Sequence, residues 1–134
     1  MSNRLSILIY IFLLAFICNN TAWCQNGSVW YFGGGDAWGN PTNDAAGLDF
    51  STNPPTPLPA DQGQLVAYEG CASLSDNTGQ IVLYTDGINV FDSTHLSMPN
   101  GSGLLGSSSS TQSAIIGPVP GVADQFYVFT NHSL

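Results

Sequence analysis

The stretch 72-ASLSDNTGQIVLYTDGINVFDS-93 alternates short apolar runs with two turn signals, D-N-T-G and D-G. Runs of β-branched and aromatic residues separated by such signals are typical of strands joined by tight loops. The run IVLY is apolar at every position, which favours a central, buried strand. We therefore expect a three-stranded antiparallel meander with strands at 65–74, 80–85 and 88–91.

The two loops of this meander carry specific predictions. Residues 76–79 are expected to form a four-residue hairpin loop in which Asp76 and Asn77 bond their own backbone. Asp86-Gly87 is predicted as a two-residue type I′ turn, because both central residues of that turn need positive φ. The inward candidates on the first strand are Val66, Tyr68 and Cys71.

The rest of the chain is also predicted to be rich in strands and turns, since it holds 15 Gly and 8 Pro. Phe126 to Asn131 echoes Ile81 to Asp86 at an offset of 45 residues. A repeat of that length, with several strands to a unit, is typical of β-propeller blades. Other strands are expected at 29–32 and 113–116, with a brief extended piece at 47–50 inside a long loop.

The predicted fold class is therefore all-β, with antiparallel meanders forming a partial β-propeller of about two blade-like units and a period of about 45. A sandwich with two similar hairpins is the alternative. Four blades need more than 134 residues, and the second unit stops partway. We accordingly expect residues 25–134 to be the N-terminal part of a propeller-like domain in a longer protein.

The first residues predict export. Arg4 precedes an apolar run from Leu5 to Cys18, which is the pattern of a signal peptide over residues 1–24, cut between Cys24 and Gln25. The run is shorter than the about 20 apolar residues of a membrane-spanning helix. The sequence thus predicts a secreted or cell-surface protein with no membrane insertion after cleavage.

Cleavage would leave a chain without Lys or Arg. All nine acids lie after Gln25, so the formal net charge would change from −8 to −9. Nucleic acid and anionic membrane surfaces are therefore poor partners. Cys71 would be the one cysteine left, which excludes an internal disulfide. Its predicted role is that of a small buried hydrophobe.

Two motif matches carry no predicted chemistry. Residues 101–106, GSGLLG, fit G-x-G-x-x-G, but the dinucleotide fingerprint needs a strand before it and a helix after it. Asp124, the acid about 20 residues further on, is expected in a turn. The hairpin 75-SDNTG-79 is a poor match to the Asp-box of sialidase-type propellers, which is itself a folding element.

No catalytic or cofactor-binding residue is predicted. His95 and His132 lie in loops, away from any acid and nucleophile pattern. The first long loop gathers oxygen donors that calcium uses, but their spacing fits no EF-hand, so solvated turn residues are favoured. The calcium candidates are Asp36, Asp44 and Asp49.

The aromatic residues raise the possibility of sugar stacking. Most of them, including Trp30, Tyr68 and Phe126, fall at strand positions where core packing is the usual role. Trp38 lies among loop residues and is the exception expected to be exposed.

Several stretches together resemble the N-terminal region of large secreted Bacteroidetes proteins of the gliding-motility-associated, or type IX secretion (type B sorting domain), group. They are 28-SVWYFGGG-35, 47-GLDF-50, 69-EGCASLSDNTGQIVLYTDGINVFDS-93, 98-MPNGSGLLGSSSSTQSAIIGPVPG-121 and 126-FYVFT-130. The resemblance implies a propeller-like module, often followed by PKD-type repeats and a sorting domain. This chain departs from it by the insertion DAWGNPTN after Gly35. The group has no agreed catalytic residues, so none transfer.

The expected function is a non-catalytic binding or adhesion module of a larger exported protein, linked to gliding or surface attachment. Its expected partners are an extracellular glycan or surface protein and the remaining blades of the same polypeptide. The alternative is a propeller-type glycan hydrolase or glycan-binding domain of an extracellular enzyme. A hydrolase needs paired carboxylates, and Glu69, the only Glu, has no evident partner in the sequence.

Overall fold

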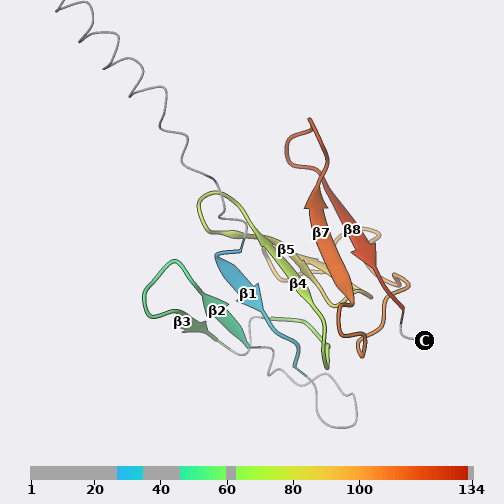
Figure 1. Ribbon diagram of the computed structural model, residues 1–134, viewed down its shortest axis with the longest axis horizontal. Helices are drawn as coiled ribbons and strands as arrows, with labels where there is room; N and C mark the ends of the chain where they lie inside the picture. Colours follow the sequence, from blue (N-terminus) through green and yellow to red (C-terminus); the bar gives the residue numbers. More distant parts are fainter. Residues whose placement is uncertain (1–26, 35–45, 60–62, 133–134) are drawn as a thin grey trace, which may run out of the picture.

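The computed structural model describes residues 27–34, 46–59 and 63–132, and this part of the chain is antiparallel all-β without a helix. Its strands form three small sheets that follow one another in chain order (Figure 1). The first contains β1 (Val29–Tyr31), β2 (Gly47–Asp49) and β3 (Thr56–Leu58); the second β4 (Ala72–Ser75), β5 (Ile81–Thr85) and β6 (Val90–Asp92); the third β7 (Ala114–Pro118) and β8 (Phe126–Thr130).

The predicted meander is confirmed, with β5 at its centre between β4 and β6. Its first strand is shorter than predicted, because ladder pairing begins at Ala72 instead of Leu65. The inward assignment of Val66 and Tyr68 was wrong by one residue, since Leu65 and Ala67 are buried and Tyr68 is 48% exposed, whereas Cys71 does pack against the core. A shift of one position moves a side chain to the other face of an extended segment.

The loop at Asp86-Gly87 is not the predicted two-residue turn. Thr85 pairs with Val90, so four residues lie between the strands. Gly87 has a φ of +87°, but Asp86 does not have the positive φ that a type I′ turn requires. Instead the buried Asp86 carboxylate accepts the backbone N–H groups of Ile88 and Asn89, at 2.8 and 2.6 Å. The side chain thus organises a wider loop.

The D-N-T-G loop is also one residue longer than predicted, since Ser75 pairs with Ile81. Asp76 Oδ1 accepts three hydrogen bonds, from the backbone N–H and the hydroxyl of Thr78 and from the backbone N–H of Gln80. Gly79 completes the loop with a φ of +87°. The prediction that Asp76 bonds its own loop is therefore confirmed.

A second loop, after β6, repeats this arrangement. Asp92 Oδ1 accepts the N–H and hydroxyl of Thr94 and the N–H of Leu96. His95, with a φ of +64°, takes the place of the glycine. Beyond the loop, Ser97 bridges to Phe91 and extends the edge of the second sheet. The shared D-x-T pattern was visible in the sequence.

These loops predict a loss of stability in acid. Hydrogen bonds from Thr78 and Thr94 lower the pKa values of the Asp76 and Asp92 carboxyls below their ordinary value of 3.8. A lowered folded-state pKa stabilises the fold above the unfolded-state pKa, and this contribution disappears as the pH falls through the folded value. We expect the urea midpoint to fall below about pH 4. The double variant D76N/D92N should weaken this dependence; an unchanged acid profile would contradict it.

The free edge of β1 is held by side chains of the neighbouring chain segment, 71–75. The backbone N–H groups of Val29 and Tyr31 donate to Ser75 Oγ and Ser73 Oγ, both at 3.0 Å. The Cys71 thiol donates to the Tyr31 carbonyl at 3.2 Å. Positions 71, 73 and 75 alternate along the chain and therefore share one face. Small polar side chains here bring the first sheet against β4.

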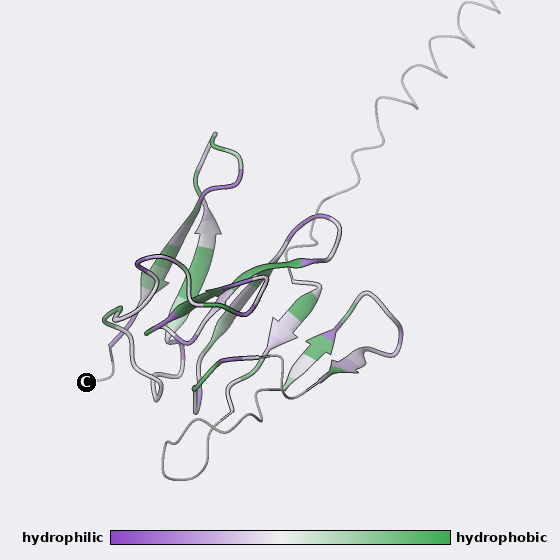
Figure 2. Ribbon diagram, turned by 180° about the vertical axis from the view of Figure 1, so that it is seen from behind, coloured by the Kyte–Doolittle hydropathy of each residue, from purple (hydrophilic) through white to green (hydrophobic). Residues whose placement is uncertain are grey.

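Two cores lie on the two sides of the second sheet. Between it and the first sheet, Tyr31, Leu65 and Tyr84 are buried together with Val29. The other core packs the second sheet against the third and, as Figure 2 shows, hydrophobic residues run along these strands. It contains Leu74, Leu83 and Val90, with Val82, Leu104, Ile116, Phe126 and Val128 packed against them. The middle sheet is thus covered by its neighbours in the sequence.

The segment 98–113 binds these parts together as a strap of backbone hydrogen bonds. Gly106 N–H donates to the Gly87 carbonyl, and Tyr68 and Gly70 donate to the carbonyls of Ser108 and Ser110. A Cβ on Gly106 would lie 2.2 Å from the Gly87 oxygen, so glycine is needed for the close approach. Gly101 and Gly106 therefore serve chain packing, Gly103 supplies a positive φ of +73° in open space, and no helix follows them.

Candidate functional site

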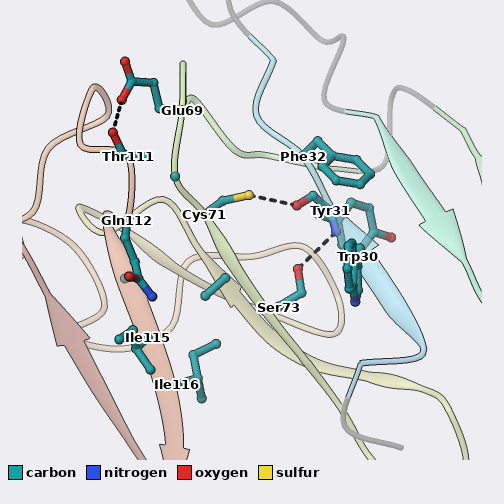
Figure 3. A pocket seen from close by; sticks show the side chains of 13 residues that line it. Trp30, Tyr31, Phe32, Glu69, Cys71, Ser73, Thr111, Gln112, Ile115 and Ile116 are labelled. Atoms are coloured by element: carbon teal, nitrogen blue, oxygen red, sulfur yellow. Dashed lines mark hydrogen bonds between the residues drawn. The ribbon is translucent and has the colours of Figure 1, made fainter.

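An open groove of about 530 Å³ lies between β1 and the start of the third sheet, over the segment that leads into β4 (Figure 3). The chain 70–73 forms its floor. One wall carries Trp30, Tyr31 and Phe32, and the facing wall carries residues 111–112 and 114–116. The groove exists because β4 contacts both β1 and β7 but pairs with neither.

The β1 wall presents exposed aromatic rings. Trp30 is 48% exposed and packs against Phe32 and Phe50, with ring centroids 6.3 and 5.0 Å apart. The expectation that Trp30 belongs to the core is therefore wrong. In the alternation along β1, Val29 and Tyr31 are buried, which leaves Trp30 on the opposite face. Trp30 and Phe32 give the groove an apolar wall, and Phe50 packs against Trp30 without lining the groove.

Polar groups gather at one end of the groove. The Glu69 carboxylate accepts the Thr111 hydroxyl at 3.0 Å, whereas the Gln112 side chain points away from this pair, along the same wall toward Ile115 (Figure 3). Glu69 is the one carboxylate among the described residues that line the groove. The wall with Gln112 adds the 50% exposed Ile115. The groove thus combines apolar walls with one carboxylate, one amide and several hydroxyl groups, among them those of Thr111 and Ser73.

Cys71 lies in the groove floor and is only partly buried. Burial raises the pKa of its thiol above the ordinary value, and the nearby Asp86 charge adds to this rise. The thiol therefore stays protonated and donates a hydrogen bond to the Tyr31 carbonyl oxygen. This is a structural role, as predicted, but a polar one: the thiol acts as a hydrogen-bond donor between two segments.

The calcium candidates are not brought together by the described residues. The Asp49 carboxylate accepts the Ser51 N–H at 2.8 Å and so closes the turn after β2. Asp36, Asp44 and the predicted exposed Trp38 lie outside the described residues. Within the described ranges, no group of three or more His, Cys, Asp or Glu side chains is placed to hold a metal ion.

The two histidines occupy different surroundings. His95 Nδ1 lies 3.0 Å from the Tyr84 hydroxyl, and its ring contacts Tyr31 edge-on. His132 is exposed beyond β8, and Asp124 lies in the β7–β8 loop with a φ of +57°. His95 therefore helps to close the core between the first two sheets.

The groove was missed at the sequence level because its walls come from three distant segments. The alternation in 29-VWYF-32 was the available signal, since it places Trp30 and Phe32 on the face opposite Tyr31. Nothing in the local sequence indicates that Glu69 meets Thr111, 42 residues later.

Comparison with known proteins finds no matching family model, curated protein or solved structure. In the ranges that the structure describes, no helix has the length and apolar character needed to cross a membrane.

Proposed function

We propose that the chain is a non-catalytic binding module that acts at the cell exterior and holds a glycan chain in the groove between β1 and β7. The observation that carries this proposal is that one groove combines the exposed Trp30 wall with a polar end formed by Glu69 and Thr111. Aromatic faces pack on the apolar faces of sugars, while a few placed polar groups bind hydroxyls and fix orientation.

The exterior location rests on the signal-peptide pattern of residues 1–24, which lies outside the described residues, and on the resemblance to exported gliding-motility-associated proteins.

The proposed architecture is a partial propeller. Three small antiparallel sheets stacked in chain order support it, because successive blades pack face to face. The remaining blades of the same polypeptide would cover exposed apolar side chains outside the groove, such as Phe129.

A glycan hydrolase is the second candidate, because the structure places Glu69 in the groove. Glycoside hydrolysis uses two carboxyl groups about 5–10 Å apart on either side of the bond that is cut. The described lining offers Glu69 alone, and the Thr111 hydroxyl already occupies one of its oxygens. This favours binding over hydrolysis.

The test is glycan binding to the purified exported protein, measured by array and calorimetry. W30A should weaken binding about two- to twelve-fold, since a packed aromatic ring is worth about 0.5–1.5 kcal/mol. Y127A is the matched control: Tyr127 is 50% exposed, similar to Trp30, but does not line the groove. Equal losses in both variants would contradict the groove assignment. Glycan turnover that disappears in E69Q would establish the hydrolase instead.

A further inference from the structure

We infer that the groove selects glycans by charge, taking amino sugars most tightly, neutral sugars less tightly, and rejecting uronate or sulfated chains. This inference rests on the proposed glycan-binding function and names its ligand class. It follows from which charged groups surround the groove and which are missing from its described lining.

The groove has a carboxylate and no cationic side chain among its described lining residues. The whole sequence has one basic residue, Arg4, against nine acids. Recognition of carboxylate or sulfate groups relies on Arg or Lys, which supply charged donors that fit those groups. An anionic glycan would therefore meet a like charge in the groove and the negative field of the chain around it.

An amino sugar offers the complementary group. The Thr111 hydroxyl donates to one oxygen of Glu69, at 3.0 Å, and fixes the side chain at the groove end. A carboxylate has about four acceptor positions, so it still has room for an ammonium group. Two charges about 4 Å apart in a water-like medium gain roughly 1 kcal/mol, which corresponds to about five-fold in affinity.

The geometry restricts this gain to one part of the ligand. Glu69 lies with Thr111 at one end of the groove, while Trp30 and Ile115 lie away from this end, on the two facing walls (Figure 3). One sugar unit would reach Glu69 while others stack along the walls. The attraction between an ammonium group and Glu69 therefore adds to the affinity that stacking on Trp30 supplies. E69Q removes the first contribution, and W30A removes the second.

The experiment compares three oligosaccharides of equal length on the purified exported protein: glucosamine oligomers, their N-acetylated equivalents and oligogalacturonate. In mildly acidic, low-salt buffer, the amino oligomer should bind about five-fold more tightly than the acetylated one. This ratio should shrink with added salt, because partly exposed charges are screened. Oligogalacturonate should show no binding.

The E69Q variant should bring the ratio of amino to acetylated affinity close to one. D76N is the matched control, because it removes one acid outside the groove and should keep the ratio. A ratio near one in the unsubstituted protein, a ratio unchanged by E69Q, or tight galacturonate binding would each overturn the charge selection. Acetylated oligomers bound through Trp30 would then leave the glycan-binding function standing. Loss of binding to all three would overturn both.

Discussion

Replacing Gly87 by valine is expected to destabilise the fold by about 2–5 kcal/mol, from two separate causes. The residue has a φ of +87°, where a β-branched side chain costs about 1–2 kcal/mol. In addition, a Cβ would lie 2.7 Å from the carbonyl oxygen of Ser113, a backbone atom that cannot rotate away. Forcing extra atoms into a packed region costs about 1–3 kcal/mol more. Urea unfolding followed by tryptophan fluorescence measures the sum.

A matched glycine separates the two causes. Gly121 also has a positive φ, +75°, but nothing lies within 4 Å of the position of its Cβ. G121V should therefore show the backbone strain alone, about 1–2 kcal/mol. If G87V costs no more than G121V, the close approach between the Asp86-Gly87 loop and Ser113 is not present in solution. Since small domains have a total stability of about 5–15 kcal/mol, G87V is also expected to reduce the yield of folded protein.

The centre of the meander was predictable because local pattern and tertiary burial agree there. The run 81-IVLY-84 is apolar throughout, and β5 is covered on both sides, by the first sheet and by the third. The strand around Val29 and the strand from Phe126 were also predicted, although only one face of each is turned to a core. The pattern did not reveal that Trp30, Tyr127 and Phe129 are exposed on the other face.

The prediction failed where backbone pairing depends on distant residues. β3 lies in a proline-rich stretch and pairs through Thr56 and Leu58 with the edge of β2. The prolines of this stretch made composition alone predict a loop. An edge strand tolerates proline, because one of its sides makes no ladder hydrogen bonds. The segment before Ala72 was predicted as a strand, but its N–H groups at Tyr68 and Gly70 donate to the strap instead of to a strand.

The candidate groove required the fold itself. Its floor uses the side chains of Cys71 and Ser73, which replace a backbone ladder in holding β1. Hydrogen bonds through side chains hold β1 further from β4 than backbone ladder hydrogen bonds would. This wider spacing leaves the open groove beside β4. In sequence the same residues read as an ordinary alternating strand. Alternation predicts which face a residue lies on, but not whether the face meets a strand, a core or a groove.

The last prediction concerns Tyr84, the largest fully buried side chain among the residues that the structure describes. Its ring lies 4.8 Å from that of Tyr31 and is stacked on Phe91 at 5.3 Å, between centroids. Y84A would remove the centre of the core that joins the first two sheets. Large aromatic-to-alanine changes cost about 3–5 kcal/mol, which brings this protein close to unfolding.

The Y84F variant keeps the ring and removes the hydroxyl near His95, so it should lower the free energy of unfolding by about 0.5–1.5 kcal/mol.

The Y84F variant also tests the ionisation of the buried phenol. Burial raises the pKa of Tyr84 from 10.0 to about 12. A raised folded-state pKa stabilises the fold below the unfolded value of about 10 and loses this contribution as the pH rises through the folded value. Alkaline unfolding, followed by circular dichroism, should therefore be less steep in Y84F. If Y84F costs as much as Y84A, the hydroxyl and not the ring holds the two sheets together, and the packing argument is wrong.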